Sequence, residues 1–365
     1  MRIWIEKPGM FSTVQDLGRR GYQMQGVPVA GAMDTAALRL GNILVGNDEG
    51  AAGLEITMTG PLLKITEGEG CFAVTGAEAG ITKNGVALSC WTAHKVVAGD
   101  ALAFTPPKTG GSRAYFCVGG GIDVPLVMGS RSTYTRGKFG GYEGRALRSG
   151  DTLASGETDA LQAKCEGLEC PPSLRPNRDA NAPLRVIPGP QDDRFTEEGL
   201  ATFYASEYVI TNSSDRMGCR MEGPEIAHKE AADIISDAIC SGSVQVPGHG
   251  QPIVMLADRQ TTGGYTKIAT VCAVDVGNLA QRLPGQKVRF KKITVGEAVT
   301  LLQREAKLFG EMKRLRAAWR SKPAFFMPML PPPIAPAFEI AGRRHGVLNV
   351  RVDGVPHHVE WERLE

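Results

Sequence analysis

The 365-residue sequence has no run that approaches the ~20 consecutive apolar residues of a transmembrane helix. Its start, Met1 to Glu6, has no apolar stretch long enough for a secretory signal peptide. Lys and Arg (41) nearly balance Asp and Glu (39), and the net charge of +2 gives no reason to expect nucleic acid or an anionic membrane as partner. We therefore expect a cytoplasmic protein that binds neither.

Aromatic residues are also scarce, at 6% of the chain, whereas Gly (45) and Pro (23) are plentiful. This balance favours many short strands joined by tight turns over a helical bundle. A chain of this length with 42% hydrophobic residues can bury sizeable cores without disulfides or a structural metal. The composition therefore predicts a mainly β protein of two or three domains.

The eight cysteines include no CxxC pair, and no His or carboxylate cluster has metal-ligand spacing. Several cysteines, such as Cys117, lie inside apolar strand-like runs. In a chain without an export signal, we expect these to be reduced thiols that pack in the interior. Neither a metal site nor the nucleophile elbow of a hydrolase is indicated.

Strand-like runs separated by turn sequences fill residues 1–155 and predict a first β domain. Asn84-Gly85 between two apolar arms is its strongest hairpin signal. One helix interrupts the strands at Thr35 to Val45, with Asp34 as its N-cap and Gly46 as the left-handed residue that ends it.

The rest of the chain divides into three parts. Residues 156–183 lose the strand periodicity and gain proline and charge, which indicates a linker. Residues 184–310 return to strands and weakly echo the first block, which predicts a second β domain. Residues 311–365 continue a long amphipathic helix, Glu297 to Trp319, and then form a proline-rich tether and a terminal hairpin at Leu348 to Trp361.

The most concentrated polar cluster in an apolar setting is the segment 258–265, which follows a predicted strand at residues 252–256. Its arginine can grip a carboxylate or phosphate, its glutamine can donate to and accept from an amide, and its two glycines let a ligand approach the backbone closely. A hydrogen-bonded turn that caps a barrel would use the same residue types. We expect catalytic roles for Asp258, Arg259, Gln260 and Thr261, and substrate binding by Thr262 and Tyr265.

Two further residues complete the predicted substrate site. Gln245 lies inside an apolar strand and needs a partner if it points inward. Arg131 follows the glycine run at residues 119–121, which could hold an anion with backbone N–H groups. That run matches neither nucleotide-loop consensus, so a glycine-rich bulge is the simpler interpretation and no ATP site can be placed. His249, between two glycines, is typical of an exposed loop imidazole.

Several motifs, taken in order, resemble the family of biotin-dependent carboxyltransferase-like proteins that includes the C-type subunit of 5-oxoprolinase and allophanate hydrolase subunit 2. The series runs from about residue 3 to about residue 310. It includes Thr13-Val14-Gln15-Asp16-Leu17-Gly18-Arg19, Gly31-Ala32-Met33-Asp34, Pro188-Gly189-Pro190-Gln191, Ser214-Asp215-Arg216-Met217-Gly218, Asp258-Arg259-Gln260-Thr261-Thr262-Gly263-Gly264-Tyr265 and Leu283-Pro284-Gly285.

The resemblance implies a pair of cyclophilin-like β-barrel domains with a few helices, and the proline-rich tether and hairpin are additions to it. It also implies work in a hetero-oligomer with A-type and B-type subunits, which uses ATP to hydrolyse the lactam of 5-oxo-L-proline to L-glutamate. In that case Arg259 or Arg131 holds the carboxylate of a small amide substrate, and Gln260 and Thr261 address its amide while Asp258 orients the arginine or a water. Met312-Lys313 lies mid-helix, so no covalent biotin is expected on this chain.

Two alternatives stay open at this point. The chain could be the carboxyltransferase component of a biotin-dependent urea or amide carboxylase, since Gln and Thr also suit a ureido ring. It could instead be a non-catalytic regulator that binds a B-type partner. The sequence does not decide among the three.

Overall fold

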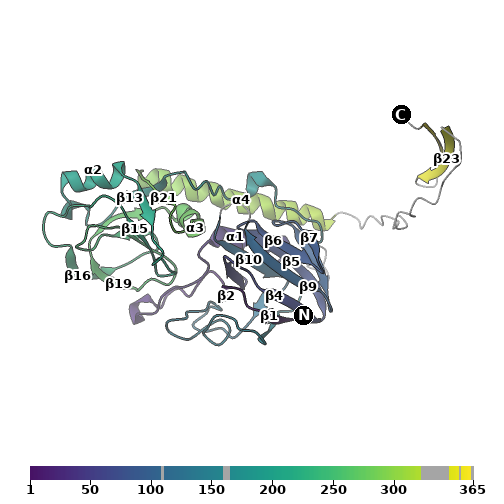
Figure 1. Ribbon diagram of the computed structural model, residues 1–365, viewed down its shortest axis with the longest axis horizontal. Helices are drawn as coiled ribbons and strands as arrows, with labels where there is room; N and C mark the ends of the chain where they lie inside the picture. The colour runs from purple at the N-terminus through teal and green to yellow at the C-terminus, as the bar shows by residue number, and fades with distance from the viewer. Residues whose placement is uncertain (108–110, 159–164, 322–344, 353–354, 363–365) are drawn as a thin grey trace. The chain divides into compact units, whose positions relative to one another are not determined.

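A computed structural model describes residues 1–107, 111–158, 165–321, 345–352 and 355–362 (Figure 1). The chain forms two compact units, Met1–Ser321 and Lys322–Glu365. The described residues contain four α-helices and are otherwise mainly β, as the composition predicts. The predicted domain boundaries at residues 155, 184 and 310 stay a prediction.

The first half of the large unit contains two sheets, a seven-stranded one in the order β11-β12-β1-β4-β9-β6-β7 and a five-stranded one in the order β2-β3-β10-β5-β8. Apolar side chains from both, among them Ile3, Leu54, Phe72 and Phe116, form one core. The strands are β1 (Arg2–Lys7), β2 (Phe11–Gln15), β3 (Gly53–Thr57), β4 (Leu62–Glu67), β5 (Glu69–Gly76), β6 (Ala79–Lys83), β7 (Val86–Leu88), β8 (Ala93–Val97), β9 (Ala101–Pro107), β10 (Arg113–Val118), β11 (Ile122–Asp123) and β12 (Thr152–Ser155).

Local signals in this half are confirmed. Helix α1 spans Thr35–Val45, and the Asp34 carboxylate accepts the backbone N–H of Ala37 at 3.2 Å. Gly46 ends the helix in the left-handed region. Asn84 and Gly85, both at positive φ, connect the paired strands β6 and β7 as a two-residue hairpin loop.

The second half is built on one eight-stranded, nearly closed and barrel-like sheet, in the order β21-β14-β15-β18-β17-β20-β13-β22. A separate pair, β16 and β19, forms a two-stranded sheet. Val186, Val244, Val254 and Ile268 are fully buried in the core of this half. The strands are β13 (Leu184–Pro188), β14 (Tyr208–Ile210), β15 (Gly218–Glu222), β16 (Asp233–Ala238), β17 (Ser243–Gln245), β18 (Ile253–Met255), β19 (Thr262–Tyr265), β20 (Lys267–Val271), β21 (Lys287–Val288) and β22 (Phe290–Lys292).

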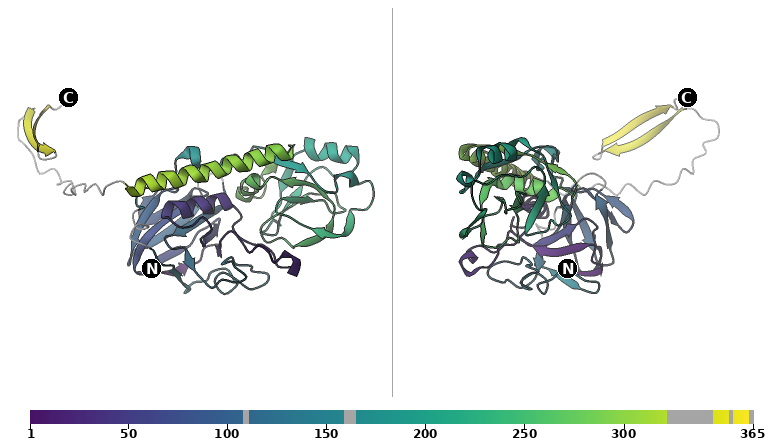
Figure 2. Two further views of the ribbon diagram at one scale, coloured as in Figure 1. Left: turned by 180° about the vertical axis from the view of Figure 1, so that it is seen from behind. Right: turned by 60° about the vertical axis from the view of Figure 1, so that its left-hand side comes forward.

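Three more helices, α2 (Glu197–Ala205), α3 (Ala273–Gln281) and α4 (Val295–Ser321), follow strands of the second half. Helix α4 confirms the predicted amphipathic helix; it contacts α1 and α3, and Figure 2 shows it running along both halves. A single strand predicted at Lys287 to Val295 is wrong: two short strands pair with different neighbours, and the helix begins at Val295. Short 3₁₀ turns lie at Gln23–Gln25, Pro172–Leu174 and Asp192–Arg194.

The cysteine prediction is wrong for one pair, because Cys71 and Cys165 form a disulfide. The two residues are 94 positions apart in sequence, yet their Cα atoms lie 6.6 Å apart, a separation that disulfides span. Spacing along the chain could not reveal this contact. The other six cysteines are free thiols, and burial raises the pKa of Cys90 to about 11.

The small unit contains the predicted terminal hairpin. Strands β23 (His345–Val352) and β24 (Val355–Glu362) pair antiparallel along their full length. The proline-rich tether and the Asp-Gly turn lie outside the described residues. None of the described helices is long and apolar enough to cross a membrane, and within the same residues no cluster of His, Cys and carboxylates could hold a metal ion.

Candidate functional site

The segment 258–265 is not one loop, which is what its composition suggested. Asp258 lies in a turn after β18, whereas Thr262–Tyr265 are strand β19, which pairs with β16. Thr261 receives the backbone N–H of Ile239 on its carbonyl oxygen at 2.9 Å, and Thr262 is exposed. The segment therefore divides its side chains among different surroundings.

Asp258 is committed to a buried ion network that joins the two halves. Its two oxygens accept from Nε and Nη2 of Arg216, both at 2.9 Å. The same guanidinium reaches Glu55 and donates to the Gly31 carbonyl at 2.7 Å, and the Tyr115 hydroxyl donates to Glu55 at 2.8 Å. Burial opposes the charge of Arg216, but Asp258 and Glu55 outweigh burial and raise its pKa.

The two arginines predicted to hold a carboxylate are also occupied. Arg259 donates to the carbonyl oxygens of Ile239 at 3.2 Å and Leu256 at 3.1 Å, and burial lowers its pKa. It lines a cavity of about 430 Å³ that Gln260 does not line. Arg131, in the first half, donates to the Val124 carbonyl at 2.8 Å and to Asp123 at 3.1 Å.

A different cavity, of about 460 Å³, unites three of the predicted residues: Gln245, Gln260 and Tyr265. It lies on the outer face of the barrel-like sheet. Val244, Cys219 and Val254 point into the core, so their strand neighbours point the other way. We call this space the amide cavity; its lining includes Arg220, Gln245, His249, Met255, Gln260 and Tyr265.

Two amides in this lining have unmet hydrogen bonds. Gln245 is only 2% exposed, and its Nε2 has no hydrogen-bond partner among the described residues. In the same part of the chain, Oε1 of Gln260 is buried without a partner. A Cβ placed on Gly263 would lie 2.8 Å from the Gln245 nitrogen and 3.4 Å from the Gln260 nitrogen, so the two amides lie close together beside a glycine. One free donor and one free acceptor thus meet at a single place.

Cations and aromatic surface complete the cavity. Arg220 on β15 lines it and forms no ion pair within the described ranges, whereas Arg136 pairs with Asp215 at 3.1 Å. Tyr265 is 41% exposed. His249 is exposed, as predicted, and its Nδ1 accepts the Gln251 N–H at 3.3 Å, which leaves Nε2 as the protonated nitrogen of the neutral ring.

Arg220 was not among the predicted site residues, because strand β15 was not predicted. Alternation in Gly218–Glu222 was the available signal: Cys219 and Met221 are buried while Arg220 is exposed. The register places Arg220 opposite Ile253 and Gln245 opposite the same residue on its other side, so the two polar side chains share one face of neighbouring strands.

Comparison with known proteins now adds to this geometry. Residues 25–292 match the family described as carboxyltransferase domain, subdomain A and B. The chain belongs to this carboxyltransferase family. The matched range contains every residue of the amide cavity and of the buried ion network.

Within the carboxyltransferase family, two relatives align over nearly their whole length. The C-type subunit of 5-oxoprolinase from Escherichia coli strain K12 is 39% identical over 320 residues, 87% of this chain and 97% of the relative. The protein of the same name from Haemophilus influenzae is 36% identical over 83% of this chain and 95% of the relative.

Longer relatives contain this domain as one part. Urea amidolyase of Saccharomyces cerevisiae is 32% identical over 79% of this chain but only 16% of the relative. Among solved structures, the urea carboxylase of Kluyveromyces lactis superposes with a TM-score of 0.80 at 30% identity and covers 85% of this chain and 29% of that one. The chain thus corresponds to less than a third of these enzymes.

Proposed function

We propose that this chain is the C-type subunit of an ATP-dependent 5-oxoprolinase, which hydrolyses the lactam of 5-oxo-L-proline to L-glutamate together with A-type and B-type subunits. The nearly full-length match to two proteins of that name supports the assignment. The observation that carries it to this site is the pair of unmet amide groups on Gln245 and Gln260. The proposal places this work in the cytoplasm and gives both halves the cyclophilin-like barrel fold.

A lactam complements the amide cavity group by group. Its carbonyl oxygen needs a donor, which Nε2 of Gln245 supplies, and its N–H needs an acceptor, which Oε1 of Gln260 supplies. Arg220 provides the guanidinium for the carboxylate of 5-oxoproline. Since rotating a glutamine amide by 180° exchanges its donor and acceptor, the pair also accepts the ring in the reverse orientation.

Binding alone does not open a lactam, so the remaining chemistry is assigned to the complex. The cavity lining holds the lactam in place but presents few groups able to take a proton near neutral pH: His249, and Asp215, which is paired with Arg136. We assign ATP binding and activation of the lactam to the A-type and B-type partners. In this scheme Asp258 and Arg259 position the turn, and Gln245, Gln260 and Arg220 contact the substrate.

The test is reconstitution of the chain with its A-type and B-type subunits, assayed for ATP-dependent formation of glutamate. Gly263→Ala should abolish most activity, because the new methyl group would lie 2.8 Å from the Gln245 amide nitrogen. Arg131→Ala, on the other half, is the matched control and should retain activity. Full activity in Gly263→Ala would remove the amide cavity from the mechanism.

A carboxyltransferase function is the second candidate, favoured by the description of the matched family and by the urea amidolyase relatives. A ureido ring offers the same N–H and C=O pair to the two glutamines. Transfer of a carboxyl group from added carboxybiotin to urea, without glutamate formation from 5-oxoproline, would favour it. A chain that binds a B-type partner but supports neither reaction would be a regulator.

A further inference from the structure

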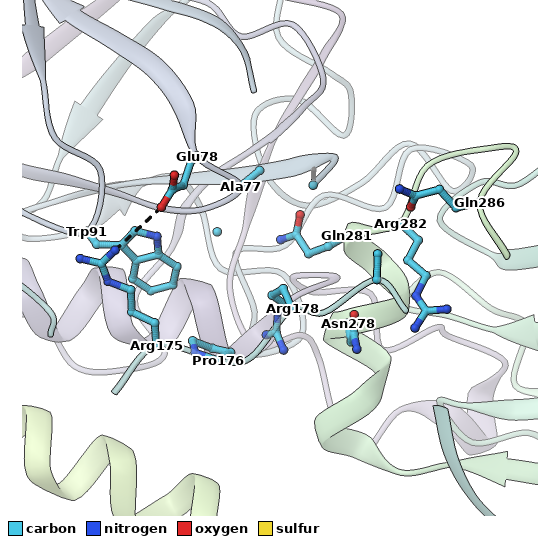
Figure 3. Close-up of a pocket in the computed structure, with 13 residues that line it drawn as sticks. Ala77, Glu78, Trp91, Arg175, Pro176, Arg178, Asn278, Gln281, Arg282 and Gln286 are labelled. Atoms are coloured by element: carbon cyan, nitrogen blue, oxygen red, sulfur yellow. Dashed lines mark ion pairs between the residues drawn. The ribbon is translucent and has the colours of Figure 1, made fainter. Parts of the chain in front are cut away.

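A second cavity, of about 480 Å³, is lined by residues from both halves of the large unit and from the segment between them (Figure 3). This volume lies in the range of ~300–1,000 Å³ typical of small-molecule sites. We call it the arginine cleft; the residues that matter are Glu78, Trp91, Arg175, Arg178, Asn278 and Arg282. None of them belongs to the amide cavity.

Two polar groups in this lining are buried without partners. Asn278 is 6% exposed and Arg282 is 5% exposed. Within the described part of the chain, Oδ1 of Asn278 and Nε of Arg282 have no hydrogen-bond partner. Nδ2 of Asn278 donates to the Asp179 carbonyl at 3.3 Å, which fixes the orientation of the amide. The two residues are four positions apart at the end of α3, so they lie on one face of the helix.

The charges around the cleft leave one guanidinium uncompensated. Arg178 donates to both oxygens of Asp34, and Arg175 lies over Trp91 and pairs with Glu169 at 3.0 Å and with Glu78 at 3.9 Å. Arg282 instead donates to two backbone carbonyls, and no carboxylate among the described residues forms an ion pair with it. Burial accordingly lowers its pKa. A buried cation of this kind calls for an anion.

We propose that the arginine cleft binds a free acidic amino acid. Its α-carboxylate pairs with Arg282 and its ammonium donates to Oδ1 of Asn278, which satisfies both orphaned groups with adjacent groups of one ligand. Its side-chain carboxylate reaches toward Arg175 on the opposite wall. The ligand's net charge of about −1 matches the one uncompensated guanidinium. Naming L-glutamate, the product, as the physiological ligand rests on the proposed function.

Calorimetric titration of the full-length chain with L-glutamate tests this inference without any turnover. We expect saturable binding at one site, reduced at least tenfold in Asn278→Leu and in Arg175→Gln. Arg175 lies at the cleft edge with its side chain 21% exposed, so its replacement leaves the fold intact even if Asn278→Leu does not. Gln245→Leu, in the amide cavity, is the matched control and should bind glutamate as the unaltered chain does.

Glutarate and inorganic phosphate complete the experiment. Glutarate has both carboxylates but no ammonium and should bind at least tenfold more weakly, and phosphate should not compete. Equal binding of glutarate, competition by phosphate, or no saturable binding of glutamate or aspartate would each overturn the proposal. Because no partner or ATP is added, loss of 5-oxoproline turnover in the reconstituted complex would contradict the proposed function alone.

Discussion

Two glutamine amides, rather than the predicted arginines, determine what the amide cavity can hold. The polar atoms of Asp258 and Arg259 are engaged by their own surroundings, whereas Gln245 and Gln260 keep unmet groups beside Gly263. A buried amide without a partner destabilises the free protein by about 1–3 kcal/mol. A substrate that satisfies both groups recovers this free energy on binding, which is why we place recognition there.

Replacing Gln245 by leucine, which is similar in size, should therefore affect function and stability in opposite directions. We expect the activity of the reconstituted complex to fall about tenfold or more, since one hydrogen bond contributes about 0.5–1.5 kcal/mol. The melting temperature should stay the same or rise, because the variant no longer buries an unpaired N–H. Unchanged activity together with a lower melting temperature would show that Gln245 is structural.

Arg216 makes the opposite prediction, because it is a structural residue. Replacing it by alanine leaves the carboxylates of Glu55 and Asp258 buried without their cation. We expect the free energy of unfolding to fall by about 3–5 kcal/mol, as when one partner of a buried ion pair is removed. Urea denaturation checks this. Arg131→Ala, which removes a partly exposed pair with Asp123, should cost less than about 1 kcal/mol.

At the scale of elements, helix α4 depends on one carboxylate for its attachment to the first half. Glu49 accepts from Arg39 of α1 at 2.5 Å and pairs with Lys313 of α4. Burial alone would raise the pKa of Glu49, but the hydrogen bonds from Lys313 and Arg39 outweigh burial and lower it below its ordinary value of 4.5. The ionised form therefore stabilises the folded chain.

This sign gives a pH-dependent prediction. Because the folded pKa is the lower one, the stabilisation by Glu49 is present above pH 4.5 and is lost as the pH falls through the folded pKa. Glu49→Gln should be less stable than the unaltered chain at pH 7, and the difference should shrink below pH 4.5. Thermal melts across this range measure it. Glu69→Gln, from an exposed pair with Lys95, should change little at either pH.

For the whole molecule, the division into two compact units has a direct consequence. The large unit, Met1–Ser321, contains both cavities and the buried ion network. We expect a chain that ends at Ser321 to fold by itself, with a melting temperature within about 3 °C of the full-length protein, since about 1 kcal/mol shifts the melting temperature by only a few degrees in large domains. A chain that aggregates or melts much earlier would contradict this.

Much of the fold could be predicted from the sequence because its signals are local. Helix α1 with its Asp34 cap, the Asn84-Gly85 hairpin and most of α4 each depend on residues within a few positions of one another. Helices α2 and α3 were not predicted: α2 opens on Thr196, whose hydroxyl accepts from the Gly199 N–H, in a region where strands were expected. Short strands such as β15 carry too few residues for their alternation to stand out.

The candidate site divides in the same way. The sequence by itself determined the family and the segment in which Gln260 and Tyr265 lie, since motif order needs no coordinates. Only the tertiary structure decided which polar side chains are free, because Asp258 meets Arg216 across 42 residues and Glu55 meets the same guanidinium across 161. Whether a side chain is committed or available depends on such distant partners, and burial sets the cost of leaving it unpaired.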